Sequence, residues 1–178
     1  LAFAAYIEAD DKKSAVDVTL TFFPPVHSDL GMSFLLGDAL KIVEKGSLEH
    51  GMLLSDVGQF AEMEGRGDPE KAQKNLDEAQ KIAEQLDNDR LRLRIMMKSI
   101  GVPLLASYDD IFDGNHDETI RLVNKFSDDR AEFLLKEILA DRLLQRENYE
   151  QARQMASEAL AAARRTRNKF LIVTGLSV

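Results

Sequence analysis

Apolar residues recur every three or four positions along two long segments of the chain. The apolar stripe of residues 69–86 consists of Ala72, Leu76, Ala79, Ile82, Ala83 and Leu86. The stripe of residues 127–146 consists of Leu134, Leu135, Ile138, Leu139 and Leu143. This spacing matches the 3.6-residue period of an α-helix rather than the two-residue period of a strand. Both segments are therefore predicted to be amphipathic helices.

Polar residues mark the ends of these predicted helices. Asp68 before Pro69 supplies an N-cap and a first-turn proline, and Ser127 or Asp128 is the expected cap of the second helix. A short polar break at Glu147–Asn148 separates that helix from a third one. The stripe of the third helix is mostly alanine: Ala152, Ala156, Ala159, Leu160 and Ala163. Because small side chains let helices approach closely, the last two helices are predicted to form an antiparallel hairpin.

Similar breaks divide the rest of the chain. They lie at 10–11, 24–25, 46, 65–67, 87–88 and 114–115. Alternation typical of strands is nearly absent, since the best stretch, Val16–Phe23, also fits a helix that starts at Lys12 and stops at Pro24. The step at Gly101–Pro103 is expected to break or kink a helix that begins near Asp89. The pattern predicts an all-α fold of about ten helices.

Charge and composition exclude several classes of function. The chain has 31 acidic and 23 basic residues and a formal charge of −8, so direct binding to nucleic acid is not expected. It has no cysteine, which removes thiolate metal sites and suits a cytoplasmic location. No apolar run approaches the roughly 20 residues of a membrane span, so no membrane partner is expected either.

The last predicted hairpin carries a repeat motif. The motif consists of Leu139, Ala140, Leu143, Tyr149, Ala152, Ala156, Ala159 and Leu160. It resembles the tetratricopeptide repeat, whose period is about 34 residues. Weaker copies begin at Gly67 and Gly114, which lie 47 residues apart, whereas Gly114 and Glu147 are 33 apart. The repeats are therefore irregular in length. For residues 1–60 the prediction of helices depends on apolar periodicity alone. Helical-hairpin repeats of longer period are the alternative fold.

The resemblance implies one helical-repeat domain over residues 1–178, built as a right-handed α-solenoid of antiparallel helical hairpins. The leading hypothesis for function is a protein- or peptide-binding scaffold that mediates protein–protein interaction, and not an enzyme. The alternative is a ligand- or peptide-sensing regulatory domain of a bacterial transcriptional regulator or signalling ATPase. Turns such as Ala83–Asn88 resemble the sensor portions of those proteins.

The family's geometry implies a concave groove lined by the first helix of each hairpin. In the C-terminal repeat it would place Glu137, Asp141 and Gln145 in the groove, with Tyr108 contributed by the preceding hairpin. Relatives that capture acidic chaperone tails use lysine, arginine and asparagine there. Because this chain has carboxylates instead, we expect a partner segment that is basic, or mixed basic and apolar.

Candidate metal and catalytic motifs have simpler interpretations. His27, His50 and His116 lie in or beside predicted turns without a helix-spaced second ligand, so they are interpreted as solvated turn residues and no metal or other cofactor is expected. The stretch 109–118 resembles a calcium loop, but Ile111 and Ile120 stand where oxygen ligands are required. A polar turn between helices is the preferred interpretation.

Two glycine- and serine-containing motifs are also interpreted as turns and caps. His27-Ser28-Asp29 has residue types of a catalytic triad, but Ser28 or Asp29 is more simply the N-cap of the next helix. The sequence 65–68 lacks the third glycine or the Lys-Ser/Thr pair of a phosphate-binding loop. No catalytic residue is therefore predicted.

Apolar residues lie close to both ends of the sequence. Leu1–Ala5 and Phe170–Thr174 resemble helix faces that are cut open rather than polar caps. Repeat arrays normally close with a polar outer face. The expectation is a fragment of a longer chain, whose open apolar ends would permit self-association.

Overall fold

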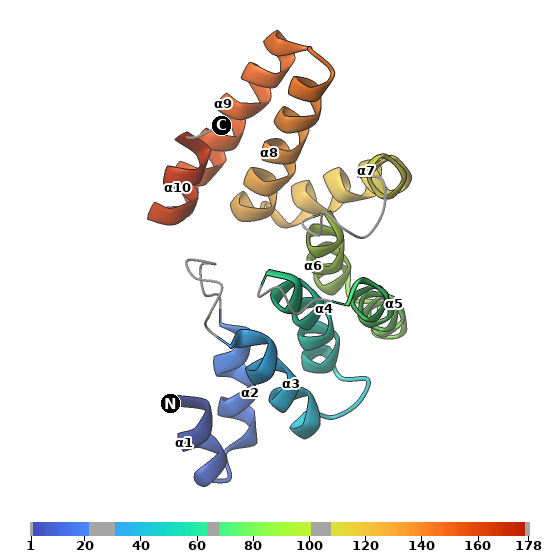
Figure 1. Ribbon diagram of the computed structural model, residues 1–178, viewed down its shortest axis with the longest axis vertical. Coiled ribbons are helices and arrows are strands. Elements are labelled where there is room, and N and C mark those ends of the chain that lie inside the picture. The colour runs from blue at the N-terminus through green and yellow to red at the C-terminus, as the bar shows by residue number, and fades with distance from the viewer. Residues whose placement is uncertain (1, 22–30, 64–67, 101–107, 177–178) are drawn as a thin grey trace. The chain divides into compact units, whose positions relative to one another are not determined.

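All regular secondary structure in the computed structural model is helical. The structure describes residues 2–21, 31–63, 68–100 and 108–176, and within these ranges it has ten helices and no strand. The prediction of an all-α chain with about ten helices is confirmed. The helices are α1 (Ala2–Glu8), α2 (Lys12–Leu20), α3 (Met32–Ile42), α4 (Leu48–Met63), α5 (Pro69–Gln85), α6 (Asp89–Ile100), α7 (Tyr108–Phe126), α8 (Asp129–Gln145), α9 (Tyr149–Thr166) and α10 (Lys169–Leu176) (Figure 1).

The chain divides into two compact units, Leu1–His116 and Asp117–Val178. Helices α1–α6 belong to the first unit and α8–α10 to the second, while the unit boundary falls within α7. Each unit has a hydrophobic core of its own.

Five helix junctions use the same two-residue turn. The first residue of each turn has φ between 46° and 60°, although it is not glycine: Asp10, Asp87, Ser127, Glu147 and Arg167. The second residue is always Asp or Asn: Asp11, Asn88, Asp128, Asn148 and Asn168. At the first four junctions the backbone N–H of the second residue donates to the carbonyl oxygen five residues earlier, at 2.8 to 3.4 Å. A left-handed residue with this hydrogen bond ends a helix by satisfying its last carbonyl groups.

The Asp or Asn of these turns also starts the following helix. Its side chain accepts a backbone N–H of the new first turn at four of the five junctions, for example from Leu91 to Asn88 (2.9 Å) and from Ala131 to Asp128 (3.0 Å). Asn148 is the exception and makes no such bond. One short polar pair thus ends one helix and caps the next, which confirms the predicted breaks at 10–11, 87–88 and 147–148.

Two predicted boundaries are wrong. Gly114–Asn115, and with it the predicted turn over 109–118, lies inside α7, because a helical glycine costs only about 1 kcal/mol and the helix continues through it. Helix α3 begins at Met32 after Gly31, whose φ of 62° glycine adopts without strain, so neither Ser28 nor Asp29 is its cap. Three predicted breaks, at 24–25, 65–67 and 101–103, lie outside the described residues.

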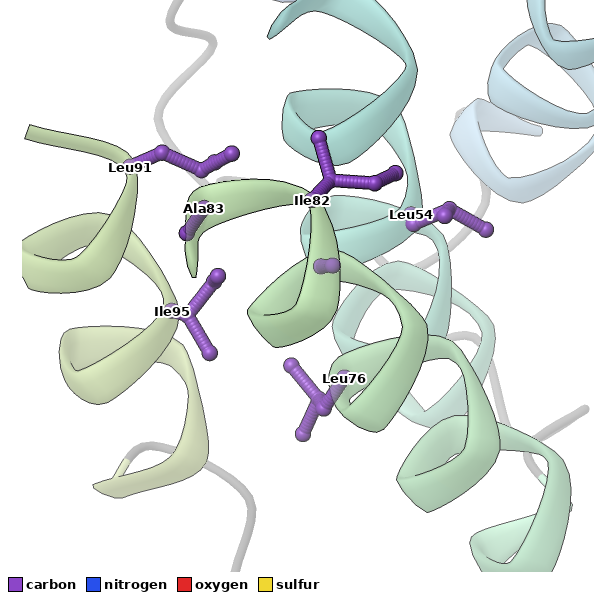
Figure 2. Packing of buried hydrophobic residues seen from close by; sticks show 7 residues of the cluster. Leu54, Leu76, Ile82, Ala83, Leu91 and Ile95 are labelled. Atoms are coloured by element: carbon purple, nitrogen blue, oxygen red, sulfur yellow. The ribbon is translucent and has the colours of Figure 1, made fainter. Parts of the chain in front are cut away.

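The core of the first unit is formed where α4, α5 and α6 meet. Figure 2 shows this cluster, which consists of Leu54, Leu76, Ala79, Ile82, Ala83, Leu91 and Ile95. Gly51 of α4 lies close against it, since a Cβ atom there would be 2.6 Å from the Cδ2 atom of Leu91. A glycine therefore permits the close approach of α4 to its neighbours. A second cluster joins Val16, Leu36, Ala39 and Leu53 from α2, α3 and α4.

The core of the second unit is built on one aromatic ring. Phe133 of α8 is fully buried against Ala159, Ala162 and Ala163 of α9 and Leu171 of α10. The predicted alanine stripe of α9 is therefore a packing surface. Ion pairs hold α8 and α9 together at its edge: Arg165 contacts Asp129 (2.6 Å) and Glu132 (2.7 Å), and Lys136 contacts Glu158.

Candidate functional site

Three of the four predicted groove residues share one face of α8. Glu137, Asp141 and Gln145 lie at successive turns of this helix, at four-residue spacing. Glu137 is half-buried, while Asp141 and Gln145 are exposed. The fourth residue, Tyr108, is the first residue of α7 and belongs to the other unit, and its side chain lies outside the described part of the structure.

Glu137 carries the electrostatic feature of this face. Partial burial raises its pKa above the ordinary value of a glutamate, and the neighbouring carboxylate of Asp141 raises it further. Within the described residues Glu137 has neither a hydrogen-bond nor an ion-pair partner. The carboxylate is therefore partly desolvated and faces a like charge without a compensating cation.

Three other carboxylates of the same unit, Asp129, Glu132 and Glu158, are compensated by cations. Asp129 and Glu132 contact Arg165, and the hydrogen bond from Lys136 lowers the pKa of Glu158, with Gln154 adding a second hydrogen bond. These pairs join α8 to α9, and neither Glu137 nor Asp141 takes part in them. We call Glu137 and Asp141 the acidic face of α8. Such a face suits a guanidinium or ammonium group, which would neutralise both carboxylates and donate hydrogen bonds to them.

A charge cluster that the sequence did not indicate lies between α4 and α6. Asp56 of α4 is buried, and Arg94 and Lys98, one turn apart on α6, both contact its carboxylate, with 3.2 Å between Lys98 Nζ and Asp56 Oδ1. The sequence contains one indication of this cluster: Asp56 is a charged residue within the largely apolar segment Met52–Val57. Because two cations contact this one buried carboxylate, the charge of Asp56 is compensated within the chain, and we interpret the cluster as structural.

The histidines do not behave as predicted. His50 is buried in the first turn of α4, where its Nδ1 accepts the backbone N–H of Gly46 at 3.1 Å and its own N–H donates to Ser47 Oγ at 3.1 Å. The arrangement resembles a capping box with Ser47 as the cap, except that the His50 side chain accepts from Gly46, one residue before the cap. The prediction of a solvated turn residue is wrong for His50, and also for the position of His116, which lies within α7. His27 lies outside the described residues.

Two other classes of site are absent from the described residues. No group of three or more His, Asp or Glu side chains there is arranged to hold a metal ion. None of the helices described is both long and apolar enough to cross a membrane.

The chain matches no known protein family, no curated protein and no solved structure.

Proposed function

We propose that this chain is a helical-repeat scaffold that binds a segment of a protein or peptide. In this proposal its helices form antiparallel hairpins of a right-handed solenoid, the arrangement that the tetratricopeptide-like motif implies. The ion pairs between the start of α8 and the end of α9 support an antiparallel pair. The recurrence of one turn geometry at five junctions supports a repeating architecture.

The turn positions favour a repeat longer than that of the tetratricopeptide family. The left-handed residues Asp87, Ser127 and Arg167 are each 40 residues from the next, with Glu147 midway between the last two. A period of about 34 residues does not fit this spacing. We therefore propose hairpin repeats of 40 residues over α6–α10, which is the longer-period alternative considered for the sequence.

The binding surface that we propose is the acidic face of α8. The observation that carries the proposal is the half-buried Glu137 carboxylate, which lacks a cation and lies beside Asp141. A partner lysine or arginine would remove the repulsion between the two carboxylates. We accordingly propose a basic, or mixed basic and apolar, partner segment.

Peptides of opposite charge test this proposal. We expect a fluorescent peptide of alternating arginine and leucine to bind with micromolar affinity, and its glutamate–leucine twin not to bind. Binding should weaken as salt is raised, because exposed charges are screened beyond about 8 Å at physiological ionic strength. Fluorescence anisotropy at two salt concentrations measures both effects.

A charge-matched pair of variants makes the test specific. Glu137→Lys with Asp141→Lys should abolish binding of the basic peptide. Glu78→Lys with Glu150→Lys changes net charge equally at exposed positions of α5 and α9 and should preserve most of the affinity. Equal losses in the two double variants would show attraction by net charge alone and would refute the acidic face as the site. Tighter binding of the acidic peptide would refute the proposal as well.

A further inference from the structure

The helix pairs α4–α5 and α8–α9 can be compared residue by residue from their caps. Ser47 caps α4 after the left-handed Gly46, as Asp128 caps α8 after the left-handed Ser127. In α5 and α9 the eleventh, fourteenth and fifteenth residues after the cap are all buried in the core of their unit. These residues are Ala79, Ile82 and Ala83 in α5, and Ala159, Ala162 and Ala163 in α9. The two helix pairs are therefore equivalent in register.

The helix that follows each pair packs on it in the same register. The third and seventh residues after the cap of α6, Leu91 and Ile95, lie in the core of the first unit. The corresponding residues of α10 are Leu171 and Gly175. Leu171 belongs to the core around Phe133, and a Cβ atom at Gly175 would lie 3.3 Å from that ring. Helix α10, which Figure 1 shows beside α9, therefore packs on α8 and α9 as α6 packs on α4 and α5.

Glu137 and Asp56 occupy the same position of these equivalent helices. Asp56 is the ninth residue after the cap Ser47, and Glu137 is the ninth residue after the cap Asp128. Asp56 is buried and Glu137 is half-buried, so both carboxylates are partly or wholly removed from water. A carboxylate at this position therefore needs a nearby cation to compensate its charge.

Helix α10 lacks the cations that α6 supplies to this position. The carboxylate of α4 is contacted by Arg94 and Lys98, the sixth and tenth residues after the cap of α6. The sixth and tenth residues after the cap of α10 are Thr174 and Val178, and Val178 lies outside the described residues. Neither residue type carries a charge. By this register, the helix that would compensate Glu137 cannot do so from either position.

We propose that Thr174 is a specificity-determining residue of the acidic face of α8, and that the group it admits is the guanidinium of a partner arginine. The inference rests on the proposed function of that face. Thr174 is half-buried, and its short side chain donates its hydroxyl to the carbonyl oxygen of Phe170 at 3.0 Å. The partner arginine would take the position relative to Glu137 that Arg94 has relative to Asp56.

The spacing of the two carboxylates favours an arginine over a lysine. Glu137 and Asp141 are one helical turn apart, and a guanidinium has five N–H donors in a planar fork that can bond to two carboxylates. Arg165 already does this on the same helix, since it contacts both Asp129 (2.6 Å) and Glu132 (2.7 Å) of α8. We therefore expect a peptide of alternating lysine and leucine to bind about threefold more weakly than the arginine–leucine peptide.

A double-mutant cycle in the free chain tests the position of Thr174. Thr174→Arg places an arginine of the chain itself where α6 has Arg94. Relative to Thr174→Gln, which has a long uncharged side chain, it should raise the melting temperature by about 2 to 4 °C. Glu137→Gln should remove this gain. Additive effects of Thr174→Arg and Glu137→Gln would show that position 174 does not address Glu137, and would overturn the proposal.

Peptide binding tests the selectivity. Thr174→Arg should weaken binding of the arginine–leucine peptide by about tenfold or more in fluorescence anisotropy, because the site then holds a cation of its own. Thr174→Ser should keep the wild-type affinity. Gln151→Arg adds the same charge at an exposed position of α9 and should preserve most of the affinity. Equal losses in Thr174→Arg and Gln151→Arg, or equal affinity for the arginine and lysine peptides, would overturn the proposal.

The two measurements separate this inference from the proposed function. Failure of the wild-type chain to bind the arginine–leucine peptide refutes the proposed function, and with it a ligand for Thr174 to select. Binding by the wild-type chain that Thr174→Arg does not weaken refutes only the role of Thr174. Binding that is lost in Thr174→Arg, together with coupling between positions 174 and 137 in the cycle, supports both.

Discussion

Two partly or wholly buried carboxylates, one in each unit, differ in how their charge is compensated. Asp56 is buried between α4 and α6 and contacts both Arg94 and Lys98. Glu137 is half-buried on α8, has only Asp141 as a charged neighbour, and lacks a cation among the described residues. Burying a charge costs free energy in both places, but only Asp56 recovers it from partners within the chain.

This difference in compensation indicates different roles: Asp56 stabilises the fold, and we propose that Glu137 binds a partner. Removing Asp56 would leave two cations without their shared anion, so the fold depends on it. We expect that Glu137 can be neutralised without loss of stability, because only burial and Asp141 act on its charge, and that it gains a cation only on binding a partner. The contrast therefore predicts opposite effects of substitution at the two positions.

We expect the largest loss of stability from a substitution that introduces a new carboxylate at a fully buried position without a cation. Ala159→Glu would place one on the packed seam between α8 and α9, where Ala159 is buried against Phe133. We expect a loss of about 3 to 5 kcal/mol in the free energy of unfolding, measured by urea denaturation. Ala152→Asp should act in the same direction, because Ala152 is also buried.

An exposed residue serves as the control for this variant. Lys74 of α5 is exposed, and Lys74→Glu should change the free energy of unfolding by less than about 0.5 kcal/mol. Equal losses for Ala159→Glu and Lys74→Glu would show that the seam tolerates charge, and the comparison between Asp56 and Glu137 would then lose its physical basis.

Removing the compensated carboxylate should have the next largest effect. Asp56→Ala leaves Arg94 and Lys98 without their common partner, and we expect a loss of about 3 kcal/mol. Glu118→Ala is the control, because Glu118 and Arg121 form an exposed pair at 3.4 Å and such pairs contribute at most about 1 kcal/mol. A loss below about 1 kcal/mol for Asp56→Ala would mean that its charge is solvated rather than compensated.

Local patterns in the sequence predicted much of this fold. Five of the six residues predicted for the stripe of α5 are buried, and only Leu86 is exposed. The cap Asp68, the alternative Asp128 for the cap of α8 and the turn at Glu147–Asn148 are also confirmed, because helical periodicity and capping involve only neighbouring residues. Gly114 shows the limit of such reasoning. A glycine within a helix and a glycine at a turn look the same in sequence when the cost of the former is small.

Contacts between distant residues account for what the sequence did not show. Asp56 and Arg94 are 38 residues apart, so their pairing depends on how α4 and α6 pack. The buried His50 accepts a hydrogen bond from Gly46, which depends on the turn before α4. Glu137 and Asp141, by contrast, were predicted as neighbours on α8, since four-residue spacing on a helix is a local property.

The smallest expected effect, and the most direct test of the comparison, is the pH dependence of Glu137→Gln. Partial burial and Asp141 raise the pKa of Glu137 in the folded chain above its value in the unfolded chain, which is about 4.3. Its contribution to stability is therefore fully present below that pH and is lost as pH rises through the raised folded pKa. Glutamine does not ionise, so Glu137→Gln should match the wild type near pH 4 and become slightly more stable by pH 7, within the ~1 kcal/mol typical of exposed charges. Urea denaturation at four pH values measures the difference.

Asp141→Asn removes only the smaller cause of the pKa shift of Glu137, so it should reproduce less than half of the gain in stability. A loss of stability in Glu137→Gln that grows with pH would show that Glu137 has a cation partner like that of Asp56, and the two carboxylates would then have the same role.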